Sequence, residues 1–116
     1  MPTYMTMTDR QGTKVTISEK SWQHVTDGHP ELMGCEDFIR RTVGDPDLEA
    51  KSATPARNPD GERWVCSRHE PTIRRSRPHL WVVIEYSPRG NWVPTAYLNA
   101  LPPPGEYRFV RLLSAR

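Results

Sequence analysis

The sequence predicts an α+β fold in which two short N-terminal helices pack on an antiparallel sheet of about four strands. Two segments before residue 47 have the apolar spacing of helices, whereas nine of the twelve prolines lie from residue 55 onward. Proline lacks a backbone N–H and disfavours a helix at the preceding residue. The second half of the chain should therefore consist of short strands and loops.

The first helix is predicted over residues 18–28. Ser18 suits the N-cap position, and one helical face is formed by Trp22, Val25 and His29. Pro30 follows directly, so the helix should end there. Before this helix, residues 1–12 are polar and expected to be loose, and residues 14–17 alternate weakly and predict a short edge strand.

A second helix is predicted over residues 35–44. It has a narrow apolar stripe of Phe38, Ile39, Thr42 and Val43. Glu36 and Asp37 lie in its first turn, where the helix dipole favours negative charge. Gly44 suits the position after the last turn, and Pro46 cannot continue the helix.

The remaining predicted elements are strands. Their ranges are 48–53, 62–67, 79–86 and 92–98, with 107–113 as a further strand or a docked tail. The run 79–86 is the most apolar in the chain, which favours the centre of the sheet. The length of 116 residues indicates a single domain over 1–116.

Composition also excludes several classes of protein. No stretch approaches the ~18 apolar residues of a membrane helix, and the first residues lack the pattern of a secretory signal. We therefore expect a cytoplasmic protein with no membrane partner, in which Cys35 and Cys66 stay reduced.

Charge is distributed unevenly along the chain. Residues 1–60 carry seven basic and ten acidic side chains, whereas residues 61–116 carry nine arginines and four acids. A cluster in the second half comprises Arg68, Arg74, Arg75 and Arg77. The guanidinium group of arginine donates two parallel hydrogen bonds to phosphate oxygens, so these four are candidate substrate-binding residues for RNA. A solvated charged face is the alternative.

His24 and His29 are the first candidates for chemistry, with Glu31 just beyond. Five residues of helix turn the chain by about 500°, so the two imidazoles converge only if the helix breaks near Gly28. His29 shares the face of Trp22, so a buried structural role is an alternative. A zinc site is another, although the spacing is not the H-E-x-x-H of metalloproteases.

Thr95 and Tyr97 are further candidates, because alternation places both on one face of a strand. Hydroxyl groups there could orient a phosphate or a ribose 2′-OH. The alternative is that both are ordinary residues of a half-buried strand.

Together these motifs resemble the small phage- and toxin-associated nucleases grouped with barnase, EndoU, the tRNA-cleaving colicins and RelE. The resemblance covers roughly residues 15–98. It is carried by the string Trp22-x-His24-Val25-x-x-x-His29-Pro30-Glu31, by Asp45-Pro46-Asp47, and by a strand ending in Thr95-Ala96-Tyr97. It implies two N-terminal helices on a four-stranded antiparallel sheet and a catalytic set of His24, His29, Glu31, Thr95 and Tyr97.

The function that the resemblance implies is metal-independent endoribonuclease activity without a cofactor. The ribose 2′-OH attacks the phosphate and leaves a 2′,3′-cyclic phosphate, and histidine suits both proton transfers. The implied partners are RNA, including tRNA, and an antitoxin or immunity protein. Two alternatives stay open: a catalytically silent RNA- or protein-binding module on the same fold, and a metal-dependent hydrolase.

Overall fold

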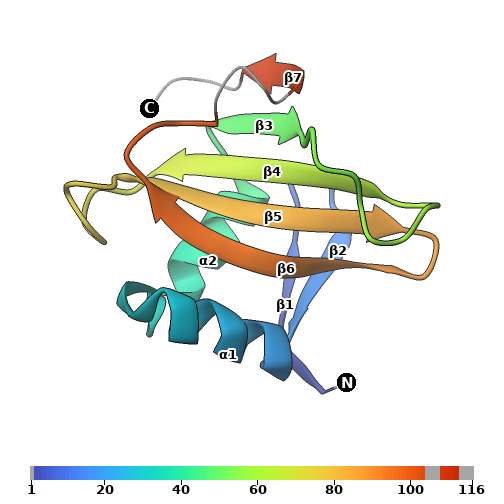
Figure 1. The fold of residues 1–116 in the computed structure, drawn as a ribbon, viewed down its shortest axis with the longest axis horizontal. Helices are drawn as coiled ribbons and strands as arrows, with labels where there is room; N and C mark the ends of the chain where they lie inside the picture. Colours follow the sequence, from blue (N-terminus) through green and yellow to red (C-terminus); the bar gives the residue numbers. More distant parts are fainter. Residues whose placement is uncertain (1, 104–107, 113–116) are drawn as a thin grey trace.

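The computed structural model describes residues 2–103 and the backbone of residues 108–112 (Figure 1). In chain order the elements are β1 (Thr3–Thr8), β2 (Lys14–Ser18), α1 (Glu19–Gly28), the 3-10 helix η1 (Pro30–Leu32), α2 (Glu36–Gly44), β3 (Leu48–Lys51), β4 (Glu62–His69), β5 (His79–Ser87), β6 (Gly90–Asn99) and β7 (Arg108–Leu112). Within this described part, no helix is both long and apolar enough to span a bilayer.

All strands belong to one sheet, in the order β1-β2-β6-β5-β4-β3-β7. Neighbouring strands run antiparallel except β2 and β6, which pair in parallel where Thr16 lies opposite Trp92. The prediction of two N-terminal helices on an antiparallel sheet of about four strands was therefore wrong. Two strands precede the helices, and the sheet is mixed and has seven strands. The same correction applies to the arrangement that the nuclease resemblance implied.

The start of the chain accounts for much of this difference. Residues 3–8, expected to be loose, form β1 and pair with β2, and only Met5 and Met7 of this strand are buried. Two apolar positions are too weak a signal to indicate a strand from sequence. Because β1 pairs with the outer side of β2, β2 lies inside the sheet and not at its edge. At the other end, residues 108–112 form a strand on β3.

The two helices begin and end within one residue of their predicted limits. The hydroxyl of Ser18 accepts a hydrogen bond from the backbone N–H of Ser21 at 3.1 Å, which caps α1. α1 ends where the N–H of His29 donates to Val25 O, immediately before Pro30. α2 buries Ile39, Thr42 and Val43 along one face.

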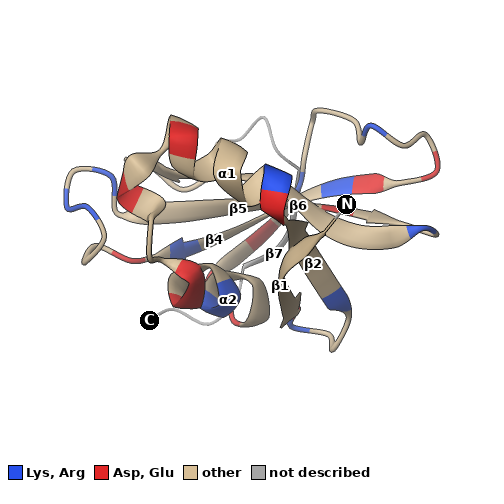
Figure 2. Ribbon diagram, turned by 90° about the horizontal axis from the view of Figure 1, so that it is seen from below, with Lys and Arg blue, Asp and Glu red and all other residues tan. Residues whose placement is uncertain are grey.

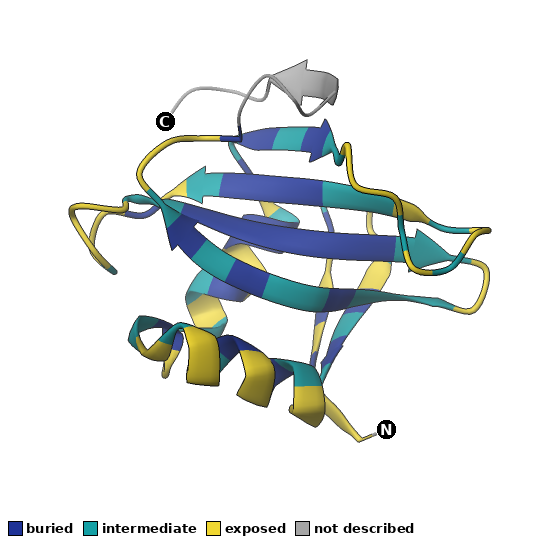
Figure 3. Cartoon of the chain, viewed as in Figure 1, coloured by how far each residue is buried: buried dark blue, intermediate teal, exposed yellow. Residues whose placement is uncertain are grey.

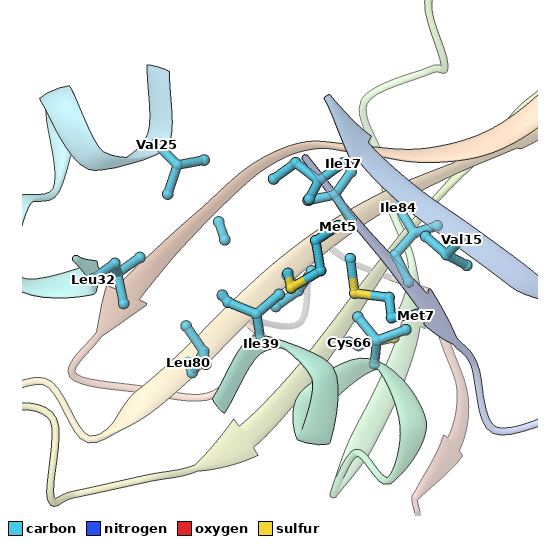
Figure 4. Close-up of a cluster of buried hydrophobic side chains, with 14 of the residues drawn as sticks. Met5, Met7, Val15, Ile17, Val25, Leu32, Ile39, Cys66, Leu80 and Ile84 are labelled. Carbon is cyan, nitrogen blue, oxygen red and sulfur yellow. The ribbon is translucent and has the colours of Figure 1, made fainter. Parts of the chain in front are cut away.

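The main core lies between these helices and one face of the sheet (Figure 4). β5 contributes Leu80, Val82 and Ile84, all at 0% exposure, to this face. The opposite face of β5 carries Trp81 and Val83, which cluster with Val65 and Tyr97. β5 is thus buried on both faces, as Figure 3 shows, and it lies at the centre of the strand order as its apolar sequence predicted.

Candidate active site

His29 lies at the end of α1, at the point where the chain turns into η1. Pro30 stops the α-helix, and the backbone of His29 leaves the helical region with φ −137°. Its imidazole is half-buried, and Nδ1 lies 4.0 Å from Oε1 of Glu31 in the first turn of η1. The break in the helix therefore sets a histidine beside a carboxylate.

Tyr97 of β6 brings a third side chain to this place. Its ring centroid is 5.9 Å from that of His29 and 5.5 Å from that of Trp81 on the neighbouring strand. Thr95 shares its face of β6 and lies opposite Val83. The structure thus joins His29, Glu31 and Tyr97 into one cluster, which we call the His29 cluster, with Thr95 on the adjacent surface.

His24 occupies a separate position on the same helix. It is exposed, and it lines a cleft of about 530 Å³ between the start of α1 and β6. Other side chains at this cleft include Lys20, Arg57 and Trp92. His24 thus lines the cleft, whereas the ring of His29, beyond the end of α1, lies near that of Tyr97.

Two features of the sheet shape that cleft. A bulge in β6 lies between the pairs Val83–Thr95 and Glu85–Trp92, so that β6 has one extra residue there. Trp92 consequently lies on the same face as Thr95 instead of pointing into the core. The buried carboxylate of Glu85 accepts hydrogen bonds from the guanidinium of Arg63 at 2.9 Å and from the backbone N–H of Arg57 at 3.4 Å.

Sequence reasoning missed Lys20, Arg57 and Trp92. Lys20 is a single exposed residue on a helix, and Arg57 lies in a proline-rich loop, so neither belongs to a charge cluster. A bulge has no reliable sequence signature, and simple alternation back from Thr95 would put Trp92 on the core face. Only the three-dimensional arrangement joins these residues.

The four predicted substrate-binding arginines divide into two kinds. Arg68 is largely buried and pairs with Glu70 Oε2 at 3.2 Å and Asp45 Oδ2 at 3.3 Å. It therefore fixes the end of α2 to the base of the β4–β5 loop. Three exposed arginines follow on that loop: Arg74, Arg75 and Arg77. The loop lies at the same end of the molecule as η1 (Figures 1 and 2), which keeps a phosphate role open for these three.

Of the two cysteines, Cys35 contacts the His29 cluster, because its Sγ donates a hydrogen bond to the backbone carbonyl of Glu31 at 3.4 Å. Cys66 is buried in the main core, where burial raises the pKa of its thiol, and Cys35 is also a free thiol. Among residues 2–103, no three His, Cys, Asp or Glu side chains are grouped closely enough to hold a metal ion. His69 and His79 face each other across β4 and β5 with ring centroids 5.3 Å apart.

Comparison of the chain with protein-family models, with curated proteins and with solved structures found no match.

Proposed function

We propose that the protein is a metal-independent endoribonuclease. The observation that supports this most is the His29 cluster, in which a half-exposed imidazole lies beside a carboxylate and near a phenol of β6. Such a histidine can take the proton of a ribose 2′-OH, and Glu31 at 4.0 Å stabilises the imidazolium that forms. The freed 2′-oxygen then attacks phosphorus and displaces the 5′-oxygen.

A second group must protonate the leaving 5′-oxygen. His24 is the candidate, because it lies on α1, which ends immediately before His29, and lines the cleft at the start of this helix. Tyr97 and Thr95 present hydroxyl groups on the adjoining face of β6 and would orient the sugar or the phosphate. The positive charge that the phosphorane requires would come from Lys20 and Arg57, which line the cleft with His24.

The test is incubation of the purified chain with total RNA in the presence of EDTA. We expect cleavage that EDTA leaves unchanged, with 5′-hydroxyl ends that a kinase labels directly and 3′ ends blocked by a cyclic phosphate. The His29→Ala variant should lose this activity, and His69→Ala, which changes a histidine outside the cluster, should keep it. Equal activity in both variants would contradict a catalytic role for His29.

Other outcomes select the alternatives. Cleavage abolished by EDTA and restored by a divalent metal would favour a metal-dependent hydrolase. RNA binding without cleavage would favour a silent binding module on the same fold. Membership of the barnase–EndoU–colicin–RelE group, a toxin or phage origin, tRNA as substrate, an antitoxin or immunity protein as partner, and a cytoplasmic location stay predictions from the sequence.

A further inference from the structure

We propose that the cleft between the start of α1 and β6 binds single-stranded RNA, with Lys20 and Arg57 on the phosphate backbone and Trp92 stacked on a base. The identification of RNA rests on the proposed ribonuclease function, since His24 lines the cleft and the His29 cluster lies just beyond the end of the same helix, α1. The cleft then supplies a substrate-binding site that lies apart from the arginine loop.

The charge of the cleft favours an anionic ligand. Lys20, His24 and Arg57 contribute to its wall, together with the hydroxyl groups of serine and threonine, and no carboxylate of residues 2–103 lines it. A second cleft, of about 300 Å³, has the opposite character, because Asp9, Glu49 and Glu62 line it. Of these two clefts, the one between α1 and β6 is therefore the one suited to a polyanion.

The two cations of the cleft are available for a ligand. Arg41, Arg63 and Arg68 each pair with a carboxylate within 4.0 Å. No such pair within residues 2–103 involves Lys20 or Arg57. A phosphate that binds these two side chains would not have to displace an existing ion pair, which lowers the cost of binding.

The position of Arg57 depends on a buried anchor. Glu85 is 2% exposed, and its carboxylate holds the backbone N–H of Arg57 while Arg63 neutralises its charge. Glu85 also lies opposite Trp92 in the sheet. The buried side chain of Glu85 thus contacts the backbone of Arg57 and lies opposite Trp92. Glu85 is therefore a positioning residue for both.

Trp92 distinguishes a nucleic acid from other anions. Its ring is half-exposed at the cleft next to Pro94, on the face to which the bulge directs it. Bases stack on aromatic side chains in single-stranded complexes, whereas an acidic peptide would need only the cations. Loss of binding after removal of the Trp92 ring is therefore expected for RNA and not for a polyglutamate peptide.

The experiment measures binding separately from cleavage. A fluorescent 2′-O-methyl octauridine, which lacks the attacking hydroxyl, is titrated with the His29→Ala protein at several salt concentrations, with anisotropy as the readout. Lys20→Gln or Arg57→Gln should weaken binding severalfold and reduce the slope of log K against log salt by about 0.7 each. Trp92→Leu should weaken binding by about five- to a hundredfold, and Trp92→Phe by less.

Two matched controls come from elsewhere in the chain. Arg40→Gln removes one exposed cation from α2, and Trp64→Leu removes a half-exposed indole from the acidic cleft. Both should leave the affinity for octauridine unchanged. Thermal melts of all variants identify any that fail to fold, and Trp92→Phe then replaces Trp92→Leu in the comparison.

The proposal is overturned if Lys20→Gln, Arg57→Gln and Trp92→Phe all bind like the two controls. It is also overturned if polyglutamate competes as well as octauridine and the Trp92 variants bind both ligands unchanged. Failure of the ribonuclease proposal has a different signature. In that case the unmodified protein leaves RNA intact, while octauridine binding still depends on Lys20, Arg57 and Trp92.

Discussion

The hydroxyl of Tyr86 donates a 2.8 Å hydrogen bond to Oδ2 of Asp9, and these residues lie 77 positions apart in the chain. Asp9 also accepts hydrogen bonds on Oδ1 from the backbone N–H groups of Gln11 at 2.9 Å and Thr13 at 2.7 Å. One carboxylate thus shapes the turn between β1 and β2 and ties it to the end of β5. Burial, together with this hydrogen bond, raises the pKa of Tyr86 well above its ordinary value.

The first prediction concerns this link. Tyr86→Phe should lower the free energy of unfolding by about 0.5–1.5 kcal/mol, the usual contribution of one hydrogen bond. Asp9→Ala should cost more, because three donors lose their acceptor. Urea unfolding at neutral pH measures both. If Asp9→Ala proved no more costly than Tyr86→Phe, the two backbone hydrogen bonds of the turn would contribute nothing.

The hydrogen bond between Tyr86 and Asp9 also illustrates which parts of the fold could be predicted from the sequence and which could not. The helix limits followed from local signals, namely Ser18 as a cap and Pro30 as a stop, and these depend only on neighbours in sequence. β1 depends on β2 and on Tyr86, which is far along the chain, so its own residues indicate little. The strand order, the parallel pairing of β2 with β6 and the bulge before Thr95 likewise depend on distant partners.

The second prediction separates Arg68 from Arg75. Arg68→Ala should cost about 1–3 kcal/mol of stability, because Glu70, whose side chain is 9% exposed, would lose one of its two ionic partners among residues 2–103 and keep Arg41. Arg75 is exposed on the β4–β5 loop, so Arg75→Ala should change stability by less than about 0.5 kcal/mol. Urea unfolding measures both effects.

If the β4–β5 loop contacts phosphate, Arg75→Ala should weaken the binding of uncleavable RNA more than Arg68→Ala does, which is the reverse of their order in stability. Arg75→Ala would then reduce the salt dependence of binding, and Arg74→Ala and Arg77→Ala would act in the same direction. An unchanged affinity in all three loop variants would leave the loop as a solvated charged face. A stable Arg68→Ala protein with weakened binding would instead return Arg68 to the substrate site.

The candidate site was predictable in part for the same physical reason as the fold. His29 and Glu31 are neighbours in sequence across a helix break, so their proximity follows from Gly28 and Pro30. Tyr97 reaches them only because α1 lies along β6 (Figure 1), a tertiary relationship. A sequence of arginines does not reveal which one is paired with carboxylates of the protein, as Arg68 is.

The third prediction concerns pH. Burial lowers the pKa of His79 below its ordinary value of 6.5, and the facing His69 acts in the same direction. The folded chain then binds fewer protons than the unfolded chain just below pH 6.5. His79 therefore contributes its full stability above that pH, and the contribution declines as the pH falls toward the lowered pKa.

Urea unfolding between pH 7.5 and pH 5.5 checks this dependence. The free energy of unfolding of the natural chain should fall with acid more steeply than that of His79→Gln, by no more than about 1.4 kcal/mol per pH unit, the limit for one proton. The carboxylates contribute equally to the pH dependence of the unfolding free energy of both proteins, so their contribution cancels in the comparison. Parallel curves for the two proteins would contradict the lowered pKa.

The last prediction concerns the catalytic role of His29. His29→Ala should reduce RNA cleavage by about 10²–10⁴, the usual contribution of one general acid or base. Its side chain is 35% exposed, and it is the backbone N–H, which alanine retains, that makes the helix-ending hydrogen bond to Val25. The melting temperature should therefore change little.

Glu31→Gln keeps the size of the side chain and removes its charge. Because a partly exposed ion pair contributes about 1 kcal/mol, this variant should cleave about five- to tenfold more slowly than the natural chain. Cleavage rates and melts on the same preparations decide between a catalytic and a structural histidine. A His29→Ala protein that melts early yet cleaves at the normal rate at low temperature would assign His29 to the packing of α1 against β6, and proton transfer would then have to come from His24.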